Sequence, residues 1–193
     1  MSRTRVLLFL FPCERMMQVK PKEKFYVAYG SNLNIRQMQM RCPTAKLYAV
    51  GEIKDYELQF KGMPDRAFAT IAPQKGSSVP AAVWKIQPMD EWSLDRYEGY
   101  PSHYFKETVP VQIGNKSVDA MVYIMNLKMD FGVPTDSYYK TVRQGYRDCG
   151  LDTDILDEAV HSSMEKFYSS LDEDDDDVFS EDDDEQESFG MEM

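Results

Sequence analysis

The pattern of hydrophobic and polar positions along the chain predicts a domain built mostly of strands. Runs of β-branched and aromatic residues recur between positions 25 and 125, and several of them alternate between apolar and polar residues, which is typical of half-buried strands. Gly51 interrupts one run, which therefore forms either two strands or one bent strand. We expect strands at 25–29, 46–60, 68–72, 79–86, 104–113 and 118–125, with a loop at 73–78 and a hairpin turn at the Gly-Asn-Lys-Ser sequence 114–117.

Two segments in the first half of the chain have the signals of helices. Asn34 is a suitable N-cap for a short helix that runs through Met40 and ends at Pro43. Pro88 suits the first turn of a second helix, which we expect to end at position 97 or 98, just before Gly99. One helix is therefore expected early in the chain and one in the middle, between the strands at 79–86 and 104–113.

The hydrophobic period becomes helical from position 135 onward. We expect one helix that is capped by Asp136 and followed by Gly150, and a second helix at 154–168 that carries Ile155, Ala159 and Met164 on one face. Most strands come before this helical pair. That order predicts an α+β domain whose sheet curls or closes, rather than alternating βαβ units.

Charge is distributed very unevenly along the chain. The 193 residues carry a net charge of −11, from 33 acidic and 22 basic residues. The segment 171–193 holds 13 of the acidic residues and none of the basic ones, so the body is close to neutral, which excludes a nucleic-acid binder defined by bulk basic charge. The segment has too little apolar surface to fold alone. We expect a disordered acidic tail, which either docks to a basic partner or only solubilises the terminus.

The segment 1–24 is expected to be a poorly structured extension of a single folded domain at 25–170. Its apolar run at 6–11 is too short to span a bilayer, and no small-residue cleavage site follows that run. The true start is Met1, Met16 or Met17, and either internal start would remove most of the extension.

The cysteines and histidines limit the chemistry that the chain can perform. Three cysteines, far apart and without a Cys-x-x-Cys pair, favour a reducing location, which we take to be the cytoplasm. Two histidines are too few for a multi-histidine metal site. We therefore expect no metal.

The sequence FYVAYGSNLN at 25–34 is the first candidate functional segment. Its strand pattern stops at Gly30, which tolerates almost any backbone angle and is followed by Ser31 and Asn32. The simplest interpretation is a turn, because these residue types dominate turns. The alternative is an anion-binding loop, because glycine lets the backbone approach a ligand and successive N–H groups can point at a carboxylate.

The second candidate is Glu98, which is expected at the C-terminal end of its helix. The negative end of a helix dipole disfavours an ionised carboxylate and raises its pKa. Aromatic residues at 97, 100, 104 and 105 would add surroundings of low dielectric constant. Glu98 is therefore either a general acid/base or an exposed helix-end glutamate without a role.

Three segments together resemble the gamma-glutamylcyclotransferase family, which is related to the AIG2-like and BtrG-like proteins. These segments are YVAYGSNLN near the start, LDRYEGYPSHYF in the middle and PTDSYYKTVRQGYRDCGL near the end. The Tyr-Gly-Ser-Asn element alone is a weak signal, but the three segments in this order and spacing are a strong one. The resemblance covers about 25–156, nearly the whole expected domain.

The resemblance implies a compact α+β domain with a mixed, barrel-like sheet, flanking helices and a cavity at one end. It also implies that Glu98 is the general acid/base and that the Gly30 loop holds the glutamyl group of the substrate. In the family, a substrate-contacting tyrosine lies four residues after a proline and seven before a helix glycine. With Pro134 and Gly145 here, this spacing points to Tyr138 rather than to Tyr139. The implied substrate-binding residues are Tyr26, Val27, Ala28, Tyr29, Gly30, Ser31, Asn32, Tyr104 and Tyr138.

The implied reaction is the cyclisation of a γ-glutamyl amide to 5-oxoproline, with release of an amino acid or an amine. The substrate's own α-amine attacks its γ-carbonyl, so no protein nucleophile and no cofactor is expected. The implied partner is a small-molecule γ-glutamyl substrate. Binding to nucleic acid or to a membrane is not expected, and a homodimer is possible.

The first motif bears on the choice of substrate. In the family that this chain resembles, relatives that act on γ-glutamyl-ε-lysine tend to carry Tyr-Gly-Thr-Leu at this position, and glutathione-specific relatives tend to carry Tyr-Gly-Ser-Leu. The Tyr-Gly-Ser-Asn form favours γ-glutamyl amino acids, or the unmasking of a γ-glutamylated amine or natural-product intermediate. A non-catalytic binding module that uses the same pocket is the alternative from another class.

Overall fold

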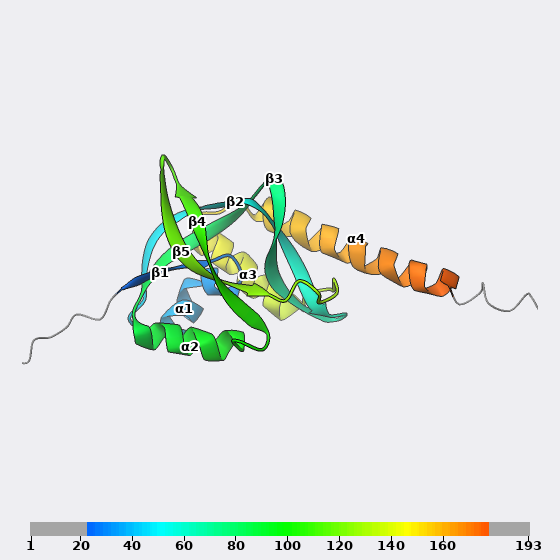
Figure 1. The fold of residues 1–193 in the computed structure, drawn as a ribbon, viewed down its shortest axis with the longest axis horizontal. Helices are drawn as coiled ribbons and strands as arrows, with labels where there is room; N and C mark the ends of the chain where they lie inside the picture. The colour runs from blue at the N-terminus through cyan, green and yellow to red at the C-terminus, as the bar shows by residue number, and fades with distance from the viewer. Residues whose placement is uncertain (1–22, 178–193) are drawn as a thin grey trace, which may run out of the picture.

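A computed structural model describes residues 23–177, with the side chains of 23–172. Five strands form a closed barrel in the order β1-β3-β2-β4-β5 (Figure 1). Neighbouring strands are antiparallel except β1 and β5, which pair in parallel at Tyr26 and Met121. The strands are β1 (Lys24–Ala28), β2 (Lys46–Met63), β3 (Arg66–Ile86), β4 (Tyr104–Ile113) and β5 (Lys116–Met125). The expected α+β class with a mixed, barrel-like sheet is confirmed.

The strand β3 is continuous, whereas we expected two strands separated by a loop at 73–78. It pairs with β2 on both sides of this segment, but Lys54 pairs with Ser78 while Tyr56 pairs with Pro73. The residues in between bulge opposite Asp55, whose φ is 60° and whose Oδ1 accepts a 2.9 Å hydrogen bond from the Gly76 N–H. The turn-forming residues therefore make a bulge that bends the β2–β3 pair, and pairing on both sides keeps the strand intact.

Four α-helices and a short 3-10 helix complete the described part of the chain. They are η1 (Ser31–Leu33), α1 (Ile35–Arg41), α2 (Pro88–Glu98), α3 (Asp136–Asp148) and α4 (Thr153–Asp177). Asn34 caps α1 as expected, since its Oδ1 accepts a hydrogen bond from the Gln37 N–H. The expected cap of α3 is wrong by one residue: the Thr135 hydroxyl accepts the hydrogen bond from the Tyr138 N–H, and Asp136 is the first helical residue.

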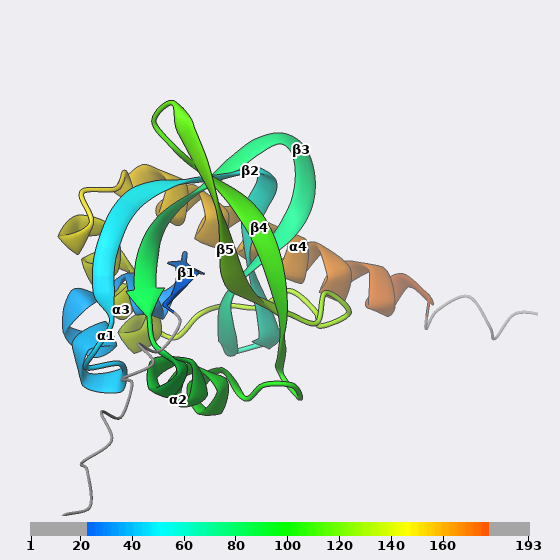
Figure 2. The same cartoon turned by 60° about the vertical axis from the view of Figure 1, so that its left-hand side comes forward.

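The helix α4 packs on the barrel through its first half and then extends away from it (Figures 1 and 2). Its buried residues are Leu156, Ala159 and Ser163, while Ile155, which we expected on this face, is 36% exposed. The Phe60 N–H of β2 donates a 2.9 Å hydrogen bond to the Ser163 hydroxyl. Ala159 is therefore buried as expected, while Leu156 and Ser163 are buried in place of their neighbours Ile155 and Met164.

The helix α4 continues to Asp177, so 171–177 is helical where we expected disorder. Extending an existing helix adds one hydrogen bond for each residue that it fixes, without a new nucleation cost. Residues 178–193 and 1–22 lie outside the described residues, as do the candidate start residues. No helix of the described chain is long and apolar enough to cross a membrane.

Removal of residues 171–193 is expected to leave the fold intact, because Leu171 is 47% exposed at the far end of α4. The melting temperature should change by less than about 3 °C, the shift that about 1 kcal/mol causes in a chain of this size. Thermal unfolding followed by circular dichroism measures it. The contrasting variant is Ser163→Ala, which leaves the Phe60 N–H without its buried partner and should lower the melting temperature more. A larger loss in the truncated chain would show that the tail packs on the body.

Candidate active site

The helix α2 places Glu98 at one end of the barrel, and both ends of this helix are fixed by local interactions. At its start, the Gln87 and Asp90 side chains and backbone N–H groups form a capping box. At its end, Gly99 adopts a left-handed conformation with φ 66°. A Cβ atom on Gly99 would also lie 2.7 Å from the His103 Nδ1. Glycine is therefore required here, and it ends the helix at Glu98 as the sequence predicts.

The loop after β1 forms the facing wall of the site. Gly30 has φ −113°, outside the left-handed region, so a positive φ is not the reason for glycine. The reason is close approach: a Cβ atom would lie 3.2 Å from the Ala69 Cβ and 3.3 Å from the Tyr138 Oη. The loop can therefore pack directly against β3 and α3.

A small cavity of about 30 Å³ lies between these elements. Glu98 contributes the one carboxylate of its lining, and tyrosines form most of the rest. It is lined by Tyr26, Tyr29, Gly30, Ser31, Asn32, Ala69, Glu98, Tyr104, Tyr123 and Tyr138. The structure therefore brings together eight of the ten residues that the sequence singled out.

Two expected residues do not line the cavity, and two lining residues were missed. Val27 and Ala28 have fully buried side chains in the barrel core, as strand alternation requires for at least one of them. Tyr123 on β5 and Ala69 on β3 line the cavity instead. No local motif marks either residue, and only the closure of the barrel brings their strands to this end.

The hydrogen bonds of the cavity give each tyrosine hydroxyl a defined role. Tyr29 donates to the backbone carbonyl of Tyr123 at 2.6 Å, and Tyr104 donates to the backbone carbonyl of Ala69 at 3.1 Å. Tyr138 accepts from the Ala69 N–H at 3.2 Å. The oxygens of Tyr29 and Tyr104 can therefore accept a further hydrogen bond, while the hydroxyl proton of Tyr138 is free to be donated.

The side-chain amide of Asn32 connects the two walls. Its Nδ2 donates to the Glu98 Oε1 and to the Tyr26 Oη, both at 2.8 Å. Its Oδ1 accepts a 2.6 Å hydrogen bond from the Arg41 Nη1. Arg41 is a further residue near the site that sequence reasoning missed, because it lies in α1 outside the quoted motifs.

Burial raises the pKa of Glu98 from 4.5 to about 7, while the charge of Arg41 and the hydrogen bond from Asn32 act in the opposite direction. The pKa values of Tyr26 and Tyr138 are raised, mainly by burial and secondarily by interactions that include the nearby Glu98 charge. These phenols therefore stay protonated at neutral pH. Glu98 alone in this cavity changes its protonation state near neutrality, which suits it to accept and return a proton.

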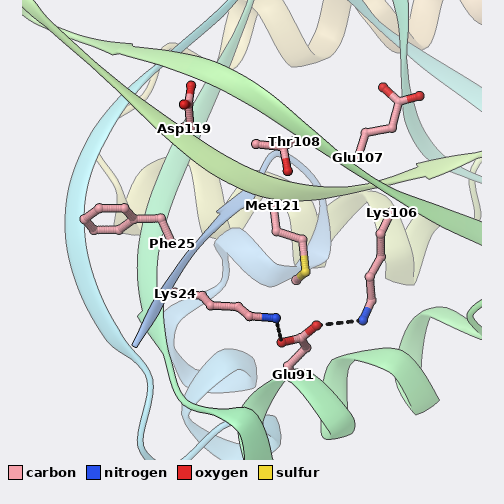
Figure 3. A pocket seen from close by; sticks show the side chains of 8 residues that line it. All are labelled: Lys24, Phe25, Glu91, Lys106, Glu107, Thr108, Asp119 and Met121. Carbon is pink, nitrogen blue, oxygen red and sulfur yellow. Dashed lines mark hydrogen bonds and ion pairs between the residues drawn. The ribbon is translucent and has the colours of Figure 1, made fainter. Parts of the chain in front are cut away.

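A larger hollow on the surface has a different character (Figure 3). Its volume is about 520 Å³, and Glu91 of α2 lies on one side of its lining, with Lys24 Nζ at 2.6 Å and Lys106 Nζ at 2.9 Å. Lys106 also pairs with Asp95 at 2.7 Å. Glu91, Lys24 and Lys106 are thus paired with one another, whereas Glu98 in the smaller cavity is the carboxylate whose pKa is raised to about 7. Among residues 23–177, no group of three or more His, Cys, Asp or Glu residues could hold a metal ion.

The fold and the site define a small α+β barrel domain with one buried carboxylate of raised pKa in a tyrosine-lined cavity. The family model described as Gamma-glutamyl cyclotransferase, AIG2-like, matches residues 26–142. The chain belongs to this family. This membership supports cyclotransferase activity.

Individual relatives agree with this assignment. The chain is 30% identical to a bovine protein named Gamma-glutamylcyclotransferase, over 73% of this chain and 79% of the relative, and 29% identical to a human protein of the same name, over 65% and 71%. A solved structure titled Gamma-glutamyl cyclotransferase superimposes with a TM-score of 0.65 at 26% identity, over 72% of this chain and 86% of that one.

Gly30→Val is expected to damage substrate binding, because its branched side chain would push against Ala69 and Tyr138 and narrow the cavity. We expect KM to rise by about 10-fold or more, the effect of losing roughly 1.4 kcal/mol of binding. Steady-state kinetics measures it. Gly76→Val is the control for destabilisation alone, because its φ of 87° strains the backbone while the residue lies outside the cavity lining and has no neighbour within 4 Å of an added Cβ. Unchanged KM in Gly30→Val would contradict the close-approach argument.

Proposed function

We propose that this protein is a γ-glutamylcyclotransferase, which converts a γ-glutamyl amide into 5-oxoproline and a free amino acid or amine, with Glu98 as the general acid/base. One observation carries the proposal: the cavity holds a single carboxylate whose pKa of about 7 lets it exchange a proton at neutral pH. Membership of the family supports the same reaction class.

The chemistry needs one group that first takes a proton and then returns it. The α-ammonium of the substrate, with a pKa of roughly 8, loses a proton to ionised Glu98. The free amine then attacks the γ-carbonyl carbon and closes the five-membered ring. Protonated Glu98 gives the proton to the leaving nitrogen as the amide C–N bond breaks. The second proton of the ring nitrogen passes to the released amine, which leaves as an ammonium ion. The proposed balance is one γ-glutamyl amide to one 5-oxoproline and one amine, with Glu98 restored.

The polar groups of the cavity match the polar groups of a glutamyl substrate. We assign the α-amine to the acceptors, which are Glu98 and the hydroxyl oxygens of Tyr29 and Tyr104. The carbonyl and carboxylate oxygens are assigned to donors, which are the Tyr138 hydroxyl and the backbone N–H groups of the Gly30 loop. Tyr138 is thus the proposed donor to the oxygen that becomes negative during ring closure, a type of interaction worth about 3 kcal/mol when aligned.

Substrate binding requires the cavity to open, because about 30 Å³ holds little more than a water molecule. Tyr97 is the side chain with room to move, since it is 46% exposed and reaches the site through a 3.0 Å hydrogen bond with the Ser31 Oγ. We propose that this contact breaks when the glutamyl group enters.

The substrate is proposed to be a γ-glutamyl amino acid, with a γ-glutamylated amine or natural-product intermediate as the variant on the same chemistry. A non-catalytic binding module has no use for a carboxylate that titrates near neutrality, so the raised pKa of Glu98 favours an enzyme. A cytoplasmic location and a homodimer stay predictions.

The test is 5-oxoproline release from a panel of γ-glutamyl amino acids, γ-glutamyl amines, γ-glutamyl-ε-lysine and glutathione. We expect turnover of at least one γ-glutamyl amino acid, with equal rates in the presence and absence of a metal chelator, because the substrate supplies its own nucleophile. Binding without turnover across the panel would favour the binding module. A rate abolished by chelator and restored by one divalent ion would contradict a purely carboxylate mechanism.

The rate is expected to rise with pH through the ionisation of Glu98. Only the ionised carboxylate can accept the ammonium proton, so kcat/KM should increase about 10-fold per pH unit below the pKa and level off above about 7. Initial rates from pH 5 to 9 on the best substrate measure this limb. A limb near pH 4.5, the ordinary value for glutamate, would mean that burial does not raise the pKa as argued.

A further inference from the structure

The Asn32 side chain has two possible orientations, and only one of them supports Glu98. With Nδ2 toward Glu98, the amide donates to the carboxylate and to Tyr26 at 2.8 Å each. In the flipped orientation, Oδ1 would face the ionised carboxylate, and two acceptors would repel each other. Something must therefore select the productive orientation.

Arg41 makes that selection through its chemistry. A guanidinium has five N–H donors and no acceptor, so the atom of Asn32 that faces the Arg41 Nη1 at 2.6 Å must be Oδ1. A flip would place Nδ2–H against Nη1–H as well as Oδ1 against the carboxylate. The two unfavourable contacts fix the amide.

Arg41 is itself held in place on further sides. Its Nη2 donates to the Gln37 Oε1, one turn earlier in α1. Its guanidinium carbon lies 3.6 Å from the centroid of the Tyr97 ring, a cation–π geometry. A cation in the last turn of α1 would also suit the helix dipole, but the dipole alone does not require the contacts with Asn32 and Tyr97.

We propose that Arg41 is a positioning residue, which locks the Asn32 amide so that its N–H donors face Glu98. The effect is to keep the ionised form of Glu98 available in a cavity that otherwise disfavours charge. The proposal rests on the proposed function only in naming Glu98 as the proton carrier, and its first test needs no substrate.

Arg41 is the one cation among the groups that act on Glu98 in the described part of the chain. The titratable groups that interact with Glu98 from each packed element are Arg41 on α1, Tyr26 and Tyr29 at β1, Tyr104 on β4, Tyr123 on β5 and Tyr138 on α3. The phenols are neutral at neutral pH. Loss of Arg41 therefore removes both a favourable charge and the selected amide orientation.

The first experiment follows the Glu98 carboxyl carbon by NMR from pH 4 to 9, with Glu98→Gln to assign its signal. Arg41→Gln is expected to raise the titration midpoint by about one unit or more, and Arg41→Lys, which keeps the charge, by less. The matched control is Arg36→Gln, which removes an exposed charge from the same helix and should shift the midpoint by less than about 0.3. The proposal is overturned if Arg41→Gln leaves the midpoint unchanged or if Arg36→Gln moves it as far.

A double-mutant cycle separates action through Asn32 from the charge of Arg41 alone. In an Asn32→Ala background, Arg41→Gln should shift the midpoint by about half as much or less. An equal shift in both backgrounds would mean that only the charge acts. If Asn32→Ala does not fold, solvent exchange of the Asn32 side-chain amide protons replaces the cycle: Arg41→Gln should speed it about 10-fold, and an unchanged rate overturns the proposal.

The kinetic test distinguishes failure of this proposal from failure of the proposed function. Where a γ-glutamyl compound is turned over, the acidic limb of the kcat/KM profile should move with the NMR midpoint in Arg41→Gln. A limb that stays in place while the midpoint moves would overturn the positioning role. If no γ-glutamyl compound is turned over, the proposed function fails, while the NMR result still decides whether Arg41 orients Asn32.

Discussion

Glu98→Gln is expected to lower kcat by about 10²- to 10⁴-fold, with substrate affinity changed by no more than about a few-fold. Glutamine keeps the shape of the side chain and the oxygen that accepts the 2.8 Å hydrogen bond from Asn32. It cannot take the proton of the α-ammonium or return it to the leaving nitrogen. The change therefore removes the proton transfer and leaves the cavity in place.

Two further variants make this result specific. Glu98→Asp should also lose most of the activity, because its carboxyl group is one methylene shorter and cannot reach the proton from the fixed helix end. Glu91→Gln is the matched control on the same helix, since Glu91 pairs with Lys24 and Lys106 outside the cavity. Its kcat should stay close to that of the wild type. A Glu98→Gln enzyme that keeps a tenth or more of the wild-type kcat would exclude Glu98 as the proton carrier.

Local sequence signals predicted the parts of the site that are set by the chain near each residue. The N-cap Asn34, the helix start at Pro88 and the stop at Gly99 all depend on nearest neighbours. They were enough to place Glu98 at a helix end. The direction of the Glu98 pKa shift was also predicted from the sequence. Its main cause is burial, which corresponds to the expected surroundings of low dielectric constant rather than to the helix end.

The remaining features depend on contacts between distant segments. Tyr123 and Ala69 line the cavity because β5 and β3 both reach its end of the closed barrel. Arg41 does not line it but contacts Asn32, because α1 lies beside the loop after β1. The bulge at 73–78 in β3 carries the signals of a loop, but pairing with β2 on both sides keeps it in the strand. The reason for glycine at position 30 could not be predicted from the sequence either. It is the close approach of Ala69 and Tyr138, which come from distant segments, and not a positive φ.

Glu98→Gln is also expected to stabilise the fold at high pH. The pKa of Glu98 is about 7 in the folded protein, against an ordinary value of 4.5. Between these values the folded state binds more protons than the unfolded state, so the free energy of unfolding of the wild type falls as pH rises through this window. The total loss is roughly 3 kcal/mol, because each pKa unit corresponds to about 1.4 kcal/mol. Glutamine resembles the protonated acid and avoids this loss.

The stability difference between Glu98→Gln and the wild type should therefore be small near pH 5 and grow by roughly 2–3 kcal/mol by pH 8.5. Urea unfolding at pH 5, 6.5 and 8.5 measures it. Glu91→Gln should instead be less stable than the wild type by a similar amount at all three pH values. Burial works to raise the pKa of Glu91, but the ion pairs with Lys24 and Lys106 lower it overall from 4.5. Its charged form therefore stabilises the fold throughout this range, and that stabilisation is lost only at lower pH. A difference for Glu98→Gln that is flat across pH would mean that the folded protein does not raise this pKa, and the proton carrier would then lack the property that suits it to neutral pH.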